Sequence, residues 1–136
     1  MPASRPLPSL RTTLLVDAAA CLACGALMAL ATEHLASATR IPPSLLLYAG
    51  LSLFPIALLM AVVGTRAAHS PPAVALVAGG NLLWVAASVW LLVSDAIAPS
   101  PLGVAFIAVQ AAVVAALAAL ELRGALSLRG ARTATA

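Results

Sequence analysis

Four long apolar runs, separated by short polar links, dominate the pattern of this sequence. The runs cover residues 12–32, 44–64, 73–93 and 102–122. A helix needs about 20 residues to cross a hydrocarbon core of about 30 Å, so each run is long enough to span a membrane. We therefore expect an all-α polytopic membrane protein whose single domain, residues 12–122, consists of four transmembrane helices.

The links between the runs are too short to hold a separate extramembrane domain. Pro42, Pro43, Pro71 and Pro72 immediately precede or begin the second and third runs, where proline is tolerated because the first N–H groups of a helix have no intrahelical partner. Links this short favour antiparallel, adjacent helices, which predicts an up-down-up-down bundle with little central volume. Residues 1–11 are expected to form a short disordered leader, and residues 123–136 a basic tail.

Composition supports a membrane protein and excludes a nucleic-acid-binding one. Hydrophobic residues make up 63% of the chain and charged residues only 8%, against about 25% charged in soluble domains. The net charge of +3 is carried by arginines that are scattered along the chain and form no basic patch. The expected surroundings are therefore a lipid bilayer, and we expect no nucleic-acid partner.

The arginines also predict the orientation in the membrane. Six of the seven lie before the first run, between the second and third, or after the fourth, and Arg40 alone lies on the other side. Positive residues in short loops stay in the cytoplasm, so we expect both termini to be cytoplasmic. Residues 1–31 also imitate a cleavable signal peptide, but Asp17 interrupts the apolar run and we expect the helix to be retained.

Small residues recur at helical spacing on the predicted helices. The fourth run carries Ala108, Ala112 and Ala116 in one row, and the first carries Gly25 and Ala29. Lipid tails are as apolar as leucine, so membrane helices associate mainly through such closely packing residues and through hydrogen bonds. These faces predict tight helix packing and either a homo-oligomer or a larger membrane-protein partner.

Two carboxyl groups fall within or at the edge of the predicted spans. Asp17 lies six residues after Arg11, which places it about 8–9 Å into the bilayer. A charge there is costly, so we expect an ion pair with an arginine such as Arg66 or Arg123; the alternative is a carboxyl that titrates in a transport path. Glu121 belongs to the same layer and could approach Asp17, but we expect it to be solvated near the headgroups.

Three further polar side chains, Ser52, Asn81 and Gln110, fall near the centre of the membrane. Because bulk water is absent there, buried amides must find protein partners. We expect a hydrogen bond between Asn81 and Gln110 that fixes the helix register, with a substrate-binding role as the alternative. Trp84 shares a helix face with Asn81, so we expect it to be buried with these polar groups.

Cys21 and Cys24 form a CxxC motif on one helical stripe with Asp17 and Met28. A redox dithiol or a soft-metal site for Cu(I) fits these residue types. However, a buried thiol packs as a small hydrophobe, and the chain has no second cysteine pair to pass electrons on. We expect the cysteines to serve packing, and we expect no metal, no cofactor and no catalytic residue.

Residues along all four runs form a recognisable set: Arg11, Asp17 and Gly25; Ala49-Gly50-Leu51, Leu53 and Pro55; Asn81-Leu82-Leu83-Trp84 and Ser88; Leu102-Gly103, Gln110-Ala111 and Leu120-Glu121. With them the chain resembles a group of small, uncharacterised bacterial integral membrane proteins. The resemblance implies a four-helix membrane fold and no activity. The residues leave three hypotheses: an accessory, assembly or structural subunit, which we prefer; a minimal oligomeric, proton-coupled transporter of a small solute; and a thiol or soft-metal protein.

Overall fold

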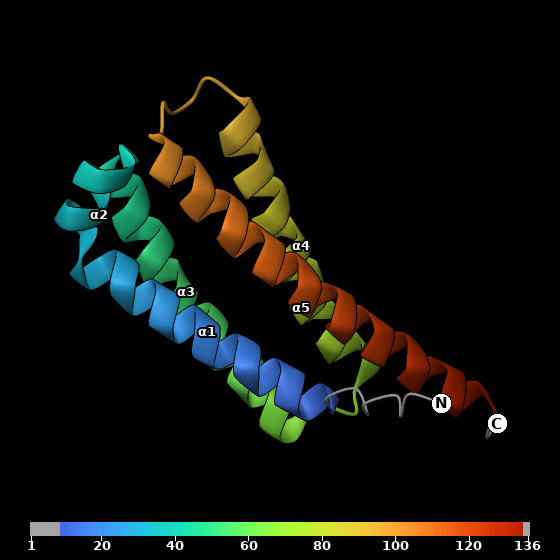
Figure 1. The fold of residues 1–136 in the computed structure, drawn as a ribbon. Helices are drawn as coiled ribbons and strands as arrows, with labels where there is room; N and C mark the ends of the chain where they lie inside the picture. Colours follow the sequence, from blue (N-terminus) through green and yellow to red (C-terminus); the bar gives the residue numbers. More distant parts are fainter. Residues whose placement is uncertain (1–8, 135–136) are drawn as a thin grey trace, which may run out of the picture.

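The computed structural model describes residues 9–134, which are all-helical. The chain forms five helices in the order α1 Leu10–Leu30, α2 Thr32–Thr39, α3 Pro43–Arg66, α4 Pro71–Val93 and α5 Pro101–Ala134 (Figure 1). All except α2 are long and apolar enough to cross a membrane, which confirms the four predicted spans. Most of the predicted leader, residues 1–8, and the last two residues of the predicted tail lie outside the described residues.

Helix boundaries differ from the expected spans at three places. α1 begins at Leu10, because the side chain of Ser9 accepts a hydrogen bond from the backbone N–H of Thr12 at 3.2 Å and caps the helix. α2 occupies most of the first link. α5 continues through the predicted tail to Ala134, since leucine, alanine and arginine, which dominate this segment, favour helix. Because α5 continues, Glu121 does not lie at the end of a helix.

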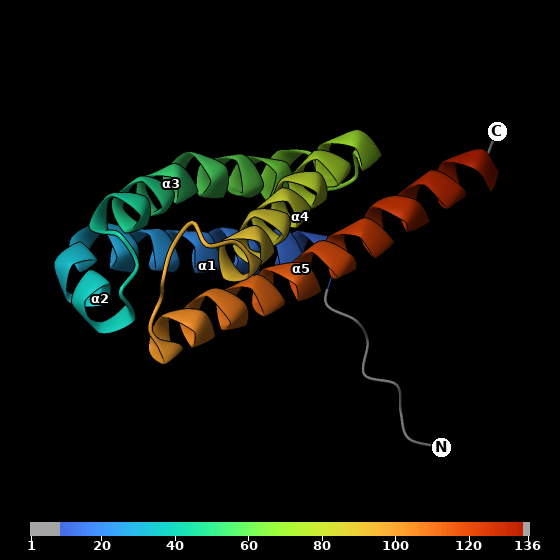
Figure 2. The ribbon, with the colours of Figure 1, turned by 90° about the horizontal axis from the view of Figure 1, so that it is seen from above.

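The helices pack as two hairpins and not as an evenly packed bundle. α1 packs along α3 and α4 along α5, whereas α3 and α4 contact each other only sparsely although they are consecutive (Figures 1 and 2). Within the first hairpin the backbones touch: a Cβ atom on Gly25 would lie 2.8 Å from the carbonyl oxygen of Gly50. Small residues therefore set the contact between α1 and α3, as expected for membrane helices.

The two hairpins are joined at both ends. At one end, Leu10 of α1 lies against Gly124 of α5, where a Cβ atom would fall 2.7 Å from Leu10 Cδ1. At the other end, Ser100 donates a hydrogen bond from its backbone N–H to the Thr39 carbonyl at 2.8 Å, and one from its hydroxyl to the Ala38 carbonyl at 2.9 Å. α2 thus fastens the first hairpin to the start of α5.

Large apolar side chains cover the outer faces of the long helices. Leu58, Leu83 and Val109 are 67%, 72% and 65% exposed, one each on α3, α4 and α5. Contiguous apolar surface of this kind is unfavourable in water and costs nothing against lipid tails. The surface and the four apolar helices together indicate a multi-pass membrane protein.

The glycine contact between α1 and α3 predicts a stability difference between two alanine substitutions. Gly50→Ala would place a Cβ atom 2.8 Å from Met28 Cβ, whereas Gly79→Ala in α4 meets nothing within 4 Å. We expect Gly50→Ala to lower the free energy of unfolding by about 1–3 kcal/mol relative to Gly79→Ala, because both gain the same helix propensity and only the first is overpacked. Circular dichroism during titration of mixed micelles with dodecyl sulfate measures the free energy of unfolding of each variant. Equal values for the two variants would contradict the close contact at Gly50.

Candidate functional site

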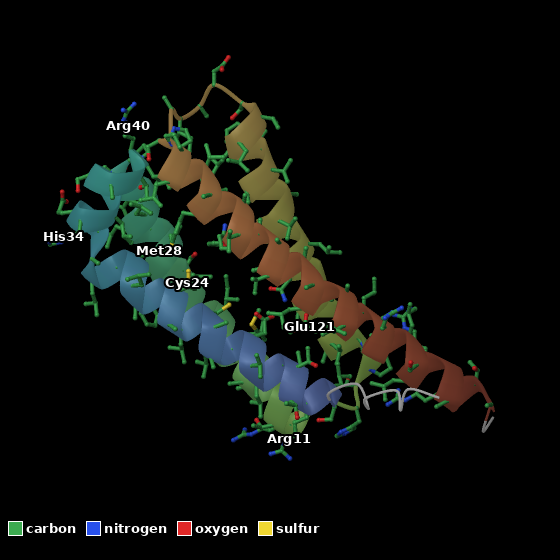
Figure 3. All side chains as sticks on the ribbon, viewed as in Figure 1. Arg11, Cys24, Met28, His34, Arg40 and Glu121 are labelled. Carbon is green, nitrogen blue, oxygen red and sulfur yellow. The ribbon has the colours of Figure 1, made fainter. Side chains whose placement is uncertain are left out.

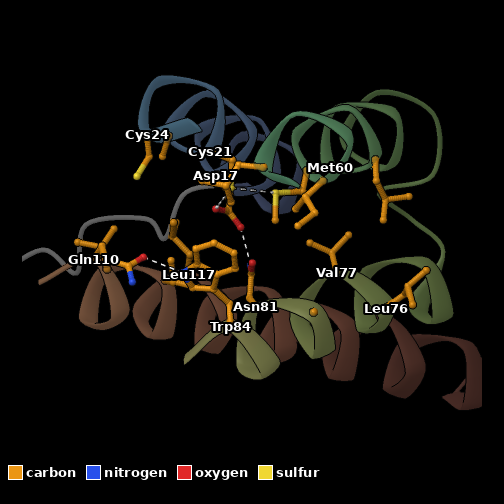
Figure 4. Close-up of a pocket in the computed structure, with 17 residues that line it drawn as sticks. Asp17, Cys21, Cys24, Met60, Leu76, Val77, Asn81, Trp84, Gln110 and Leu117 are labelled. Carbon is orange, nitrogen blue, oxygen red and sulfur yellow. Dashed lines mark hydrogen bonds between the residues drawn. The ribbon is translucent and has the colours of Figure 1, made fainter. Parts of the chain in front are cut away.

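A single asparagine joins two carboxyl groups that come from different hairpins. Asn81 Nδ2 donates to Asp17 Oδ2 at 2.5 Å (Figure 4) and to Glu121 Oε2 at 3.0 Å. Asp17 lies on α1, Asn81 on α4 and Glu121 on α5, so these bonds cross the boundary between the hairpins. The three side chains are 1%, 4% and 0% exposed, respectively. We call Asp17, Asn81 and Glu121 the acid–amide cluster.

The cluster leaves one oxygen without a donor. Glu121 Oε1 is fully buried and has no hydrogen-bond partner in the described part of the chain. Figure 3 shows Glu121 on the side of α5 that faces α1. Asp17 and Glu121 accept from the same amide and act on each other electrostatically. Two ionised carboxylates are both acceptors, so a bond between them requires a proton on one of them.

Neither carboxyl has a positively charged neighbour among residues 9–134. The groups that act on Asp17 are Asn81, Glu121 and Cys21, and those that act on Glu121 are Asp17 and Asn81. The expected ion pair between Asp17 and an arginine is therefore absent in the described chain. A buried carboxylate with no cation is strongly unfavourable, so a neutral pair requires two protons, or one proton and one cation.

The burial of Glu121 corrects the expectation that this residue is solvated near the headgroups. α5 does not end beside it but continues, and the following turn packs against α1 where Gly124 meets Leu10. Ala125, one turn after Glu121, is also buried, at 2% exposure. The next helical turn therefore covers the carboxyl and holds it inside the protein.

Gln110 takes part in a second set of polar contacts, which links α4 to α5 within one hairpin. Trp84 Nε1 donates to Gln110 Oε1 at 2.7 Å, and Gln110 Nε2 donates to Ser88 Oγ at 3.1 Å. The expected bond between Asn81 and Gln110 is therefore wrong. The antiparallel register of the two helices places Gln110 opposite Trp84 and Ser88, and Asn81 nearer Glu121. Trp84 is half-buried and joins these contacts, in partial agreement with its predicted burial.

Ser52 does not join either set of contacts. It is exposed on α3 and donates to the carbonyl of Ala49 in its own helix at 2.7 Å. A short polar side chain on a helix can satisfy itself in this way and needs no partner from another helix. Counting depth along the span places Ser52 in the central layer but does not show which face of α3 it occupies.

Both cysteines are free thiols, and each contacts a methionine. Cys21 Sγ lies 3.9 Å from Met60 Sδ and 3.8 Å from Asp17 Oδ1, and Cys24 Sγ lies 3.7 Å from Met28 Sδ. No group of three or more His, Cys, Asp or Glu side chains that could hold a metal occurs in the described residues. The sequence does not predict the contact of Met60 with Cys21, because Met60 lies on another helix, α3, and only the packing of α3 against α1 brings the two sulfur atoms together.

The acid–amide cluster borders a cavity of about 270 Å³ between the hairpins. Its polar lining consists of Asp17, Asn81, Trp84 and Gln110, and apolar side chains from all four long helices form the rest. A second cavity, of about 190 Å³, shares Trp84 and Gln110 with the first. The expectation of little central volume is therefore wrong: the hairpins separate between their joined ends, and the Trp84–Gln110 bond lies between the two cavities.

Removing the bridging amide should weaken the contact between the hairpins. In Asn81→Leu, both carboxyls lose their only amide donor, so we expect the free energy of unfolding to fall by about 1–3 kcal/mol, from two membrane hydrogen bonds of about 0.6–1.7 kcal/mol each. Ser52→Ala is the matched control, since Ser52 bonds only within its own helix, and it should change stability little. Titration with dodecyl sulfate measures the free energy of unfolding of Asn81→Leu and of Ser52→Ala. Equal changes in the two variants would show that the Asn81 bridge contributes nothing to stability.

The arrangement has a limited chemical repertoire. The two carboxyls can share a proton or attract a cation, Asn81 can keep both in position, and the cavity can hold a small apolar molecule beside them. No protein-family model, curated protein or solved structure matches this chain.

Proposed function

We propose that this chain is a small proton-exchanging transporter of a bacterial inner membrane, in which Asp17 and Glu121 alternately hold a proton and a solute. The observation that carries the proposal is the pair of fully buried carboxyls, without a positive neighbour in the described chain, at the edge of a cavity between two hairpins. Ionisable residues inside membranes typically mark ion pathways and proton relays. Packing alone gives no reason for two carboxyls at this place.

The hydrogen bonds of the cluster suit proton exchange. Asn81 donates to one oxygen of each carboxyl, so both carboxyls stay in position whichever of them carries the proton. The remaining oxygen, Glu121 Oε1, is free to share a proton with Asp17. In a low-dielectric interior a fully satisfied polar network is stable and a partly charged one is not. Loss of the proton therefore requires that another positive charge replace it.

The packing of the hairpins supports alternating access to the cavity. α3 and α4 contact each other sparsely along their length, so the hairpins can rock against each other while each stays intact. The Trp84–Gln110 bond belongs entirely to the α4–α5 hairpin. We infer that it acts as a fixed partition between the two cavities while the α1–α3 hairpin moves.

We further propose an up-down-up-down arrangement with both termini in the cytoplasm. The contact of Leu10 with Gly124 supports it, because the start of α1 and the last third of α5 then lie at the same membrane surface. Arg11 and Arg66 are exposed at helix ends and Arg123 is exposed within the last third of α5, and this arrangement places all three on the cytoplasmic side. The acid–amide cluster then lies in the inner leaflet, between the cytoplasm and the cavity.

An accessory or assembly subunit is the second candidate, and an exposed small-residue face favours it. Ala108, Ala112 and Ala116 are all exposed on one side of α5, where a second copy or a larger membrane protein could pack closely. The same face serves an oligomeric transporter equally well. Proton exchange at the buried carboxyls separates the candidates, because an accessory subunit has no need of it.

The chain provides its own controls for a test of proton exchange. Of its four carboxyl side chains, Asp17 and Glu121 are buried, whereas Glu33 and Asp95 are exposed in the links. Infrared difference spectra between acidic and basic buffer should show the carbonyl band of a protonated carboxylic acid in a dehydrated setting. We expect this band in wild type and in Glu33→Gln with Asp95→Asn, and its loss in Asp17→Asn with Glu121→Gln.

Transport itself is read from vesicles that contain the protein, a trapped pH-sensitive dye and an imposed pH gradient. The solutes tested are alanine, glucose, potassium and tetraphenylphosphonium, which represent four chemical classes. At least one of them should drive proton movement in vesicles with wild type and with Glu33→Gln and Asp95→Asn combined. The same solute should drive none with Asp17→Asn and Glu121→Gln combined. If the infrared band is absent in wild type, or if no solute moves protons, the transporter proposal fails and the accessory subunit is favoured.

Labelling with a membrane-impermeant maleimide tests the proposed orientation. Ser37 of α2 and Ser127 of α5 are both exposed, and each is replaced by cysteine in a chain that carries Cys21→Ala and Cys24→Ala. In intact spheroplasts we expect Ser37→Cys to be labelled and Ser127→Cys to be protected until the membrane is permeabilised. The reverse pattern would invert the orientation, and labelling of both from outside would contradict the three spans, α3, α4 and α5, that separate the two positions.

A further inference from the structure

We propose that the 270 Å³ cavity binds a lipophilic monovalent organic cation, of the quaternary ammonium or phosphonium class, whose charge replaces one of the two protons that keep Asp17 and Glu121 neutral. This inference rests on the proposed function and names its substrate class. Charge, the chemistry of the cavity wall and the route of access lead to it separately.

The charge of the cluster selects a cation. Asp17 lines the cavity, and Glu121, which accepts from the same asparagine, has one buried oxygen without a partner in the described chain. Two protons make the carboxyl pair neutral, and when one of them leaves, a neutral solute cannot compensate the negative charge and an anion is repelled by it. A single positive charge in the cavity then restores neutrality. Binding of such a cation therefore releases a proton.

The wall of the cavity selects an organic cation over a small metal ion. Metal ions such as Mg²⁺ and Ca²⁺ require several oxygen ligands, whereas the carboxylate and amide groups that line this cavity belong only to Asp17, Asn81 and Gln110. Most other lining side chains are aliphatic, and they are joined by the ring of Trp84 and the sulfur of Met60 (Figure 4). Aromatic rings attract cations and thioethers are polarisable, so this wall suits a diffuse charge on an apolar body.

The openings of the cavity favour a ligand that arrives through lipid. Leu59 of α3 and Leu76 of α4 line the cavity, yet they are 42% and 63% exposed. The cavity therefore reaches the outer surface of the protein where α3 and α4 contact each other sparsely. In a membrane, that surface faces acyl chains. A cation with an apolar body can dissolve there and reach Asp17 without crossing water.

Two ions of the same shape and opposite charge test the inference. Tetraphenylphosphonium and tetraphenylborate are each equilibrated by dialysis against the purified protein in mild detergent, and an indicator dye in weakly buffered solution follows protons. We expect saturable binding of tetraphenylphosphonium with release of protons, and no saturable binding of tetraphenylborate. Asp17→Asn with Glu121→Gln should weaken tetraphenylphosphonium binding by about tenfold or more, equivalent to about 1.4 kcal/mol, whereas Glu33→Gln with Asp95→Asn should not.

The outcomes separate this inference from the function on which it rests. If the phosphonium binds no better than the borate, or binds equally well without the buried carboxyls, the substrate class is wrong; proton exchange in the infrared spectra still upholds a transporter. If that proton exchange is also absent, both proposals fail. Should the buried-pair variant not fold, wild type alone decides: binding must weaken as the pH is lowered, because protons compete with the cation, and pH-independent binding overturns the inference.

Discussion

The arrangement of this protein depends on how two carboxyl groups are kept neutral where water is absent. Asp17 and Glu121 are buried on opposite hairpins, and in the described chain only an amide, a thiol and each other surround them. Lipid offers no counter-charge and no hydrogen bonds, so the protein must solve this problem internally. Asn81 donates a hydrogen bond to each carboxyl and brings α1, α4 and α5 to one point, while neutrality requires a proton on each carboxyl or a cation in place of one of the protons.

The cluster is not the only contact between the hairpins. Leu10 packs against Gly124 at one end, and Ser100 binds the end of α2 at the other. Buried ionisable groups are often no more stabilising than apolar residues of the same volume. Alanine and leucine, the common residues of these helices, would pack here without the cost of removing two carboxyls from water. The presence of the cluster is therefore better explained by chemistry than by stability.

The sequence predicts the membrane spans and the depth of each polar residue along them, but not which side chains contact each other. Helix length and apolar content located all four spans, and depth along the spans correctly raised an approach of Asp17 to Glu121. Depth does not give the register between antiparallel helices, which is why Gln110 pairs with Trp84 and Ser88 and not with Asn81. It also does not give the helix face, so Ser52 appeared central although it is exposed. The burial of Glu121 depends on the continuation of α5, which a basic tail does not suggest.

The exclusion of charge from lipid also explains how such a site would couple two movements without a separate gate. A carboxyl pair with two protons is neutral, and so is a pair with one proton and a monovalent cation; a pair with one proton and no cation, or with two protons and a cation, carries a net charge inside a low-dielectric protein. In the proposed transporter, rocking of the hairpins would therefore be easy in the two neutral states and costly in the two charged ones. One proton and one cation would then travel in opposite directions through the same cavity. Obligatory exchange would follow from the burial of Asp17 and Glu121 beside Asn81.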